Sequence, residues 1–230
     1  MASPMRRFAR WHIWLGWLAG VPLLLWTLSG LVMVARPIEE VRGEHLRREL
    51  TPAALPAGID IAVRLPDDAS RPVVAVATRV EEGRVITRLT YADESVARFD
   101  ADGRQLPPFS DVEARLLVAR RMVGGDRVAR IRLTDAAAPP LDFRRPMAAW
   151  QVTLADGTRV YVGRDSGEIA AVRTRWWRVF DFMWGLHIMD LQTREDTHHP
   201  VLILFAGLAL ASTLLGLALL FRRRKARQRQ

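Results

Sequence analysis

The sequence predicts an α+β membrane protein in which two transmembrane helices flank an extracytoplasmic antiparallel sheet with a packed helix. The chain contains two long uncharged apolar runs, at 13–35 and 201–221. At 1.5 Å rise per residue, either run is long enough to cross a hydrocarbon core of roughly 30 Å. The segment between them is rich in charged and turn residues. Its short strand-like stretches are interrupted by one helical pattern, which is typical of α+β domains.

Basic residues flank both runs and orient them in the membrane. Arg6, Arg7 and Arg10 precede the first run, and the second is followed by Arg222, Arg223, Arg224, Lys225, Arg227 and Arg229. Short basic flanks stay on the cytoplasmic side, whereas long domains are translocated largely regardless of charge. We therefore expect both termini in the cytoplasm (N-in, C-in) and the domain outside. Because the net charge of +9 is concentrated beside the spans, no nucleic-acid partner is expected.

The first run is expected to remain as a transmembrane helix rather than to be cleaved as a signal peptide. A signal peptide also begins with basic residues, but its apolar region has about 7–15 residues and ends at a small-x-small site. Here the run is longer, and Arg36-Pro37 follows it.

Small residues recur at helical spacing in both spans. The first has Gly16 and Gly20, with Ser29-Gly30 as another small patch, and the second has Gly207, Ala211 or Ser212, and Gly216. Small side chains let two helices approach closely. The spacing predicts that the spans pack on each other or on a second copy of the chain. A homodimer through the transmembrane helices is therefore an expected partner arrangement, beside the lipid bilayer itself.

These patterns divide the chain into consecutive regions. They are a cytoplasmic N-terminus at 1–12, transmembrane helix 1 at 13–35, an extracytoplasmic domain at 36–174, an interfacial amphipathic helix and loop at 175–199, transmembrane helix 2 at 200–221, and a basic cytoplasmic tail at 222–230. Within the domain we expect a short helix at 37–50, an irregular linker at 51–68, a helix at 109–123, and strands at 72–80, 85–91, 96–100, 128–134, 148–154 and 158–163.

Two local signals support this reading of the domain. Ser110-Asp111-Val112-Glu113 has the form of a capping box and marks the start of the 109–123 helix. Two hairpins end in similar turns, at 99–103 and 163–167. The likeness indicates either two related half-domains or turn chemistry alone.

The stretch 175–191 places six large side chains on one helical face, namely Trp176, Phe180, Met183, Trp184, His187 and Leu191. A face of this kind suits a helix that lies in the outer membrane interface and leads into the second span. A buried helix of the soluble domain is the alternative.

Three segments resemble the membrane proteins that carry a PepSY domain with associated transmembrane helices. They are the opening RWHIWLGW at 10–17 with WTLSG at 26–30, the hairpin VYVGRDSGEI at 160–169, and DFMWGLH at 181–187 before the final span. From the first segment to the last, the resemblance extends over most of the chain, and it is weakest at 73–104. One departure is that the family's terminal turn usually carries an aspartate where this chain has Gly163, which leaves the role of Asp165 open.

The resemblance implies a PepSY-like domain with its core at 105–172 and a degenerate first half at 70–104. It also implies a location in the periplasm of a Gram-negative bacterium, with the spans in the inner (cytoplasmic) membrane. For function it implies two kinds of role. Larger relatives with more spans look like haem-containing reductases that act on siderophore-bound iron, whereas soluble PepSY modules resemble propeptides that inhibit or regulate proteases.

Five histidines are candidate ligands of a b-type haem (haem b): His12, His45, His187, His198 and His199. Such a haem takes two axial ligands on opposite faces, and histidine is a usual choice. His12 lies at the cytoplasmic end of the first span and the other four lie beyond the outer ends of the spans. The bilayer of roughly 30 Å therefore separates His12 from the rest within one chain. An inner site needs His12 from two copies, and an outer site would use His45, His187 and His198 or His199.

No other constellation of catalytic residues is present in the sequence. It contains no G-x-S-x-G, H-E-x-x-H or phosphate-binding glycine loop, no nicotinamide or flavin motif, no recognised metal-ligand spacing and no cysteine. We therefore expect a non-enzymatic accessory or regulatory protein that binds a periplasmic partner, either a protease or an iron-uptake component. The alternative is a haem-binding electron-transfer subunit related to siderophore-iron reductases, which would be a component of a membrane ferric reductase.

Overall fold

The computed structural model describes residues 4–49 and 51–227, with side chains for 6–49 and 51–221. The chain forms two compact units. One contains the two chain-terminal segments, Met1–Pro37 and Arg178–Gln230, and the other contains Ile38–Trp177. The first unit is helical and the second carries both β-sheets.

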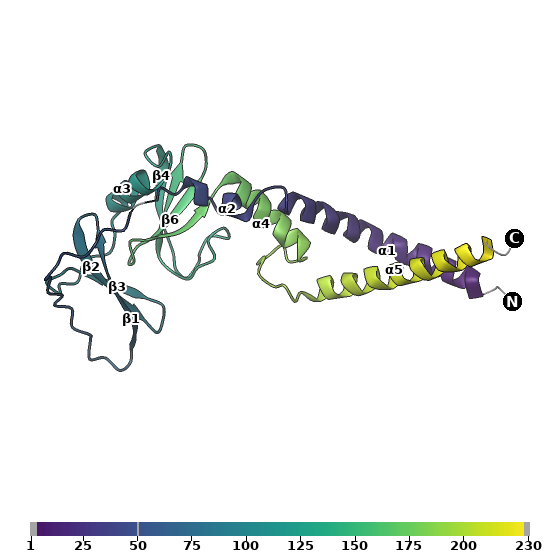
Figure 1. The fold of residues 1–230 in the computed structure, drawn as a ribbon, viewed down its shortest axis with the longest axis horizontal. Helices are drawn as coiled ribbons and strands as arrows, with labels where there is room; N and C mark the ends of the chain where they lie inside the picture. The colour runs from purple at the N-terminus through teal and green to yellow at the C-terminus, as the bar shows by residue number, and fades with distance from the viewer. Residues whose placement is uncertain (1–3, 50, 228–230) are drawn as a thin grey trace. The chain divides into compact units, whose positions relative to one another are not determined.

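The helical unit is built on two long antiparallel helices, α1 (Pro4–Met33) and α5 (Pro200–Arg227). They lie side by side, and the two ends of the chain are at the same end of the pair (Figure 1). Both are long and apolar enough to cross a membrane, which confirms the two predicted spans. Each helix extends beyond the apolar run into the basic flanking sequence, because arginine is a good helix former and does not interrupt the hydrogen-bond ladder.

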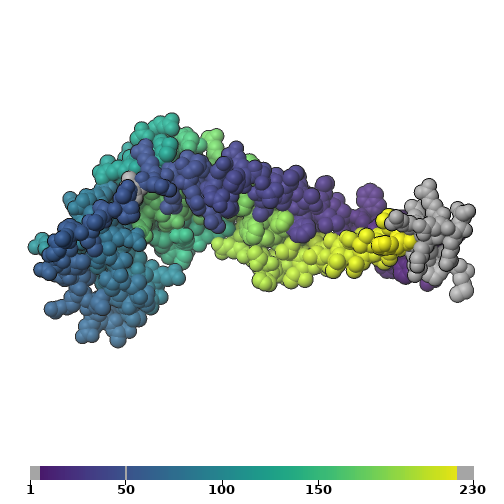
Figure 2. Space-filling view, viewed as in Figure 1, coloured from purple at the N-terminus to yellow at the C-terminus, as the bar shows by residue number. Residues whose placement is uncertain are grey.

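The contact between the spans uses only some of the predicted small residues. Ala19 is 1% exposed and Ser212 is 8% exposed, and the ring of His12 lies against Gly216. By contrast, a Cβ added to Gly16 or Gly20 would have no atom within 4 Å in the described structure. The interpretation that these two glycines join the spans within one chain is therefore wrong, because they point away from α5. Figure 2 shows the side chains of the two helices in contact along the pair.

The second unit contains two antiparallel sheets. The first has the order β1–β2–β3, formed by Val73–Glu81, Arg84–Tyr91 and Val96–Phe99. The second has the order β4–β5–β6–β7, formed by Val128–Thr134, Ala149–Leu154, Arg159–Gly163 and Ile169–Arg173. Both are meanders, so each strand pairs with its neighbour in the sequence. The predicted α+β class is confirmed, with strands close to the predicted ranges.

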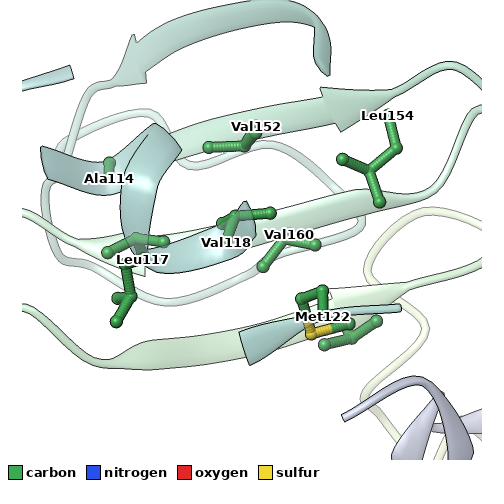
Figure 3. Close-up of a cluster of buried hydrophobic side chains, with 9 residues drawn as sticks. Ala114, Leu117, Val118, Met122, Val152, Leu154 and Val160 are labelled. Atoms are coloured by element: carbon green, nitrogen blue, oxygen red, sulfur yellow. The ribbon is translucent and has the colours of Figure 1, made fainter. Parts of the chain in front are cut away.

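Helix α3 (Asp111–Arg121) covers one face of the four-stranded sheet. Ala114, Leu117 and Val118 of the helix form one buried cluster with Val152 and Val160 of the sheet (Figure 3). The predicted capping box is present, because the Ser110 hydroxyl accepts from the Glu113 N–H and the Glu113 carboxylate accepts from the Ser110 N–H. The cap fixes where the helix starts, and the apolar face then determines how it lies on the sheet.

Two predicted helices differ from the structure. The helix expected at 37–50 is wrong, because only α2 (Ile38–Val41) and a 3-10 turn, η1 (Glu44–Leu46), form. Gly43 between them has φ of 72°, and a Cβ there would lie 2.8 Å from the Val172 side chain. The chain turns at Gly43 because glycine alone adopts this conformation without strain.

The other helix, expected at 175–191, ends earlier, and α4 spans Arg175–His187. Met189 has a left-handed φ of 59°, and the Asp190 N–H donates to the carbonyl of Gly185. This is the hydrogen bond of a Schellman motif, which terminates helices. Leu191 therefore lies beyond the helix, and is not on its apolar face as predicted.

Strand β7 was not predicted as a strand. Its sequence, IAAVR, is short, and no turn follows it before α4 begins at Arg175. It pairs with β6 through a bulge between Tyr161 and Val162. Because it pairs only on one side, β7 is an edge of the sheet.

We predict that Leu117→Ala lowers the free energy of unfolding by about 2–5 kcal/mol, because it leaves a cavity between α3 and the sheet. Leu116→Ala is the matched control, since Leu116 is 47% exposed and Leu117 is 9% exposed. The control should change stability by at most about 0.5 kcal/mol. Denaturant unfolding of the detergent-solubilised protein measures both. Equal effects of the two substitutions would contradict this packing.

Candidate functional site

His187, the last residue of α4, is held against α1 by its ring. Its Nδ1 lies 3.0 Å from the Ser29 hydroxyl and 3.2 Å from the Trp26 carbonyl oxygen. The ring stacks on the Trp26 indole with 5.1 Å between centroids and 22° between planes. A Cβ on Gly30 would lie 3.4 Å from the ring. The two small residues Ser29 and Gly30 therefore form the place where the imidazole packs.

The hydrogen bonds of His187 indicate its tautomer. The Ser29 hydroxyl donates to the Trp26 carbonyl at 2.9 Å, so its oxygen accepts from His187. The Trp26 carbonyl can only accept. Nδ1 therefore carries the proton, and in the neutral ring Nε2 carries the lone pair. This nitrogen is the one that could bind a metal or accept a proton.

The loop after α4 is organised by one carboxylate, that of Asp190. It accepts from the backbone N–H groups of Gln192, Thr193, Glu195 and Asp196, and from the Thr193 hydroxyl. These bonds, that of the Thr193 hydroxyl first, hold the pKa of the Asp190 carboxyl far below its ordinary value, although desolvation opposes them. The carboxylate replaces the backbone partners that a loop without regular structure lacks.

A buried ion pair fastens the same loop to α4. Arg194 donates to the Asp181 carboxylate at 2.5 Å, and Asp181 is 4% exposed. The Trp184 indole N–H donates to the Arg194 carbonyl oxygen at 3.1 Å. A Cβ on Gly185 would lie 2.7 Å from the Arg194 side chain. The DFMWGLH segment thus supplies an acid, an indole donor and a glycine to one local structure.

The other candidate histidines lie apart from this cluster. His12 lies at the opposite end of the helix pair, beside Gly216, and its buried Nδ1 has no hydrogen-bond partner among the described residues. His45 is exposed on η1, and His198 is exposed in the loop before α5. His199 is half-buried, and its carbonyl oxygen accepts from the Leu202 N–H in the first turn of α5.

No hydrogen bond or ring contact joins two of the five histidines in the part of the chain that the structure describes. Nor do three His, Asp or Glu side chains gather there as a metal site would require. The cavity between α1 and α5 has a volume of about 30 Å³ and an apolar lining that includes Ala19, Pro22 and Phe205. Pockets for ligands of drug size have volumes of about 300–1,000 Å³. The described residues of one chain therefore do not fit a haem.

The sheet unit contains a second candidate site, a cleft between its two sheets. The cleft has a volume of about 180 Å³ and is lined by Ala77, Arg79, Glu81, Arg88, Thr90, Val96, Ser166 and Glu168. Arg88 forms ion pairs with Glu81 and Glu168, and Arg79 lies 3.9 Å from Glu168. Burial lowers the pKa of Arg88, and the charge of Glu81 opposes this shift. The cleft thus combines two positive and two negative side chains.

Arg98 joins the same two sheets beside the cleft. It is 7% exposed, its guanidinium lies over the Phe109 ring at 4.4 Å, and it donates to the carbonyl oxygens of Asp165 and Pro107. The Asp165 backbone is therefore part of the junction between the sheets, while its carboxylate pairs with Arg164 at 3.1 Å.

Gly163 has a steric explanation. A Cβ at this position would collide with the Ser166 hydroxyl and would lie 2.8 Å from the Met147 side chain. An aspartate at this position would require the Ser166 and Met147 side chains to move.

Sequence analysis did not identify Arg88, Arg98 or Glu168 as site residues. The available signal was a charged residue in the interior of a strand-like stretch, as at Arg88 and Arg98. A buried charge in a strand requires a partner. For Arg88 and Arg98, one partner comes from the β6–β7 turn, which lies far along the chain.

The fold and the site define a class of membrane protein, with two paired spans joined through an α+β unit of two antiparallel sheets. Residues 9–230 match the family described as the PepSY-associated TM region, and the chain belongs to that family. No curated protein matches the sequence significantly, and no solved structure does.

We predict that the loop at 190–196 loses order as the pH falls below about 4, the ordinary pKa of an aspartate in an unfolded chain. Because folding depresses the pKa of Asp190, its stabilising contribution is complete above that pH and declines as the pH falls toward the folded pKa. Amide hydrogen exchange, corrected for the intrinsic effect of pH, should show lower protection of the Thr193 and Glu195 N–H groups.

Asp190→Asn should lower the protection of these amides at neutral pH and remove most of its dependence on pH. Asp196→Asn is the matched control, since its carboxylate accepts from the His198 N–H in the next turn. Unchanged loop protection in Asp190→Asn would contradict the assignment.

Proposed function

We propose that this protein is a non-enzymatic accessory protein of the bacterial inner membrane that binds a periplasmic protein partner, such as a protease or an iron-uptake component. The observation that carries the proposal is the charged cleft between the two sheets. Its volume of about 180 Å³ is below the about 300 Å³ at which pockets for drug-sized ligands begin. A cleft of this size suits one or two side chains of a protein.

The charges of the cleft support recognition of a polypeptide. Arg88 and Glu168 are bonded to each other, and Glu168 is half-exposed. A partner side chain of either sign could compete for one member of this pair, and charge complementarity of this kind contributes to specificity more than to affinity. The ion pair also fixes the two sides of the cleft, so little order is lost on binding.

The basic flanks of both spans support the proposed orientation. Arg6, Arg7 and Arg10 precede the apolar part of α1, and the basic tail follows that of α5. The two helices are antiparallel, so their basic flanks lie at the same end of the pair. The tendency of basic flanks to stay in the cytoplasm therefore favours the same orientation for both helices. The sheet unit would then lie on the periplasmic side, where the partner is found.

We predict that a single cysteine at Ala77, an exposed residue that lines the cleft, is modified in intact cells by a membrane-impermeant maleimide. The natural chain contains no cysteine, so the reaction reports on one position. With a maleimide that carries a photoreactive group, the same cysteine should be cross-linked to one protein partner. Glu168→Gln in this background should reduce the cross-linked product by about tenfold, as expected for loss of one charge-assisted contact.

Ala129→Cys is the matched control, because Ala129 is also exposed but lies on β4 and does not line the cleft. The cysteine at position 129 should be modified to the same extent as that at position 77, but it should give no cross-linked product. Protection of both cysteines until the membrane is permeabilised would contradict the orientation. Equal products from both cysteines would contradict the cleft as the binding site.

A second candidate function, that of a haem-binding electron-transfer subunit, requires two copies of the chain. It is favoured by the buried Nδ1 of His12, which has no hydrogen-bond partner among the described residues. A buried polar group without a partner is costly, and a ligand would remove the cost. When bound, haem would supply one-electron redox chemistry.

If this second function is correct, protein purified from haem-replete cells should have a Soret absorption band that is lost in His12→Ala and retained in His45→Ala. His45 is exposed on η1 and serves as the control. A colourless, folded preparation would contradict the second function and would leave the first one unaffected.

A further inference from the structure

One face of the four-stranded sheet carries a row of arginines. The register places Arg130 beside Thr153, Thr153 beside Arg159, and Arg159 beside Arg173. Residues that are paired across neighbouring strands project from the same face. These four residues, called the arginine row below, thus cross the whole sheet from β4 to β7. Residues such as Val152 and Val160 face α3, so the row lies on the opposite face.

The loop before β5 adds two more positive charges, Arg144 and Arg145, but only one buried carboxylate. That carboxylate, Asp142, is 8% exposed and accepts from the Tyr161 hydroxyl and from Arg159, both at 2.8 Å. Its backbone carbonyl accepts from Arg173 at 2.6 Å. The negative charge of Asp142 is therefore used within the fold. Two further carboxylates lie only at the margins, Asp135 after β4 and Asp156 in the β5–β6 turn.

Two of these positive side chains are exposed. Arg130 and Arg145 are exposed, and neither makes a hydrogen bond or ion pair through its side chain in the described residues. The pKa of Arg173 is lowered to about 10, first by burial and then by the charges of Arg145 and Arg144, while Asp142 opposes the shift. These guanidinium groups thus repel one another, and an added anion would relieve the repulsion.

A tryptophan lies directly beside this positive face. The guanidinium of Arg173 is 4.1 Å from the centroid of the Trp177 ring, and that of Arg144 is 5.9 Å from it. Tryptophan is enriched at the headgroup level of membranes, where its ring is half in apolar and half in polar surroundings. A residue type that is enriched at membrane interfaces and several arginines therefore occur at one place.

The chain connects this sheet to the helical unit through a short segment. β7 ends at Arg173 and α4 begins two residues later, at Arg175. Twelve residues of helix, about 18 Å, then lead to His187. His187 packs on α1 beside Ser29 and Gly30, near the end of that helix.

We propose that the arginine row, together with Arg144 and Arg145, binds the anionic phospholipid headgroups of the bilayer that contains α1 and α5. Guanidinium groups bind phosphate through paired N–H donors. Arginine near an anionic membrane surface also gains from the surface potential. This surface differs from the proposed partner cleft, whose side chains come from the other sheet and the β6–β7 turn. The short tether and Trp177 favour lipid over an acidic polypeptide as the ligand.

The test uses the full chain in nanodiscs, with a single cysteine at Thr153 in the arginine row. The rate at which the neutral reagent N-ethylmaleimide modifies this cysteine is measured in two kinds of nanodisc. One contains phosphatidylcholine alone, and the other also contains about 40% phosphatidylglycerol, which gives a strongly anionic surface. We expect the rate to fall at least about fivefold in the anionic nanodiscs and to recover at about 0.5 M salt, where charges are screened. A cysteine at Leu116, exposed on α3, should react equally in both.

Arg130→Gln with Arg145→Gln should abolish the protection, because loss of two arginines weakens docking by roughly thirtyfold. These two side chains are exposed and make no hydrogen bond or ion pair in the described residues, so the double variant should fold normally, as its unfolding curve will show. Arg104→Gln with Arg115→Gln removes the same charge from exposed positions elsewhere and should leave the protection intact.

The proposal is overturned if anionic lipid does not slow the reaction, if Leu116→Cys is slowed equally, or if protection persists without Arg130 and Arg145. It is also overturned if soluble polyglutamate protects the Thr153 cysteine in phosphatidylcholine nanodiscs while phosphatidylglycerol does not. That result would assign the face to an acidic protein.

Discussion

The antiparallel pairing of α1 and α5 is the constraint on which the rest of the structure depends. In a bilayer every backbone polar group must be bonded within the segment, so each span is a helix. Because the spans are antiparallel, the chain leaves and re-enters the membrane at the same surface (Figure 1). Everything from the end of α1 to the start of α5 is thus a single excursion anchored at both of its ends. The sheet unit cannot diffuse away from the membrane, and weak contacts there act at high effective concentration.

Arginine has three distinct physical roles in this chain. Beside the spans it acts through its charge in the proposed orientation. In the junction between the sheets, Arg88 and Arg98 are largely buried, and each is compensated by carboxylates, carbonyl groups or an aromatic ring. On the face of the four-stranded sheet opposite α3, Arg130 is exposed and makes no side-chain hydrogen bond or ion pair in the described residues. Only the burial and the partners of each side chain separate these roles, since the residue type is the same in all three.

Features that depend on residues close in sequence were predictable, and features set by distant contacts were not. The spans, the capping box at Ser110 and most strand positions follow from local composition and turn chemistry. The break at Gly43 depends on the close approach of Val172, and the outward position of Gly16 depends on which side of α1 packs against α5. The candidate site likewise combines a feature that was predictable from local sequence with contacts that were not. His187 could be singled out from the aromatic pattern around it, but its contacts with Ser29 and Trp26 arise from a helix more than 150 residues away.

The packing of His187 on α1 constrains the number of residues within α1. Insertion of one residue between Ala19 and Ser29 would advance the later part of α1 by 1.5 Å and rotate it by about 100°. Ser29 and Gly30 would then no longer face the imidazole, although the hydrophobicity of the span would be unchanged. Only changes near a whole number of turns, such as seven residues, would restore the original face. The number of residues between Ala19 and Ser29 is therefore constrained, whereas the exposed positions of the span need only remain apolar.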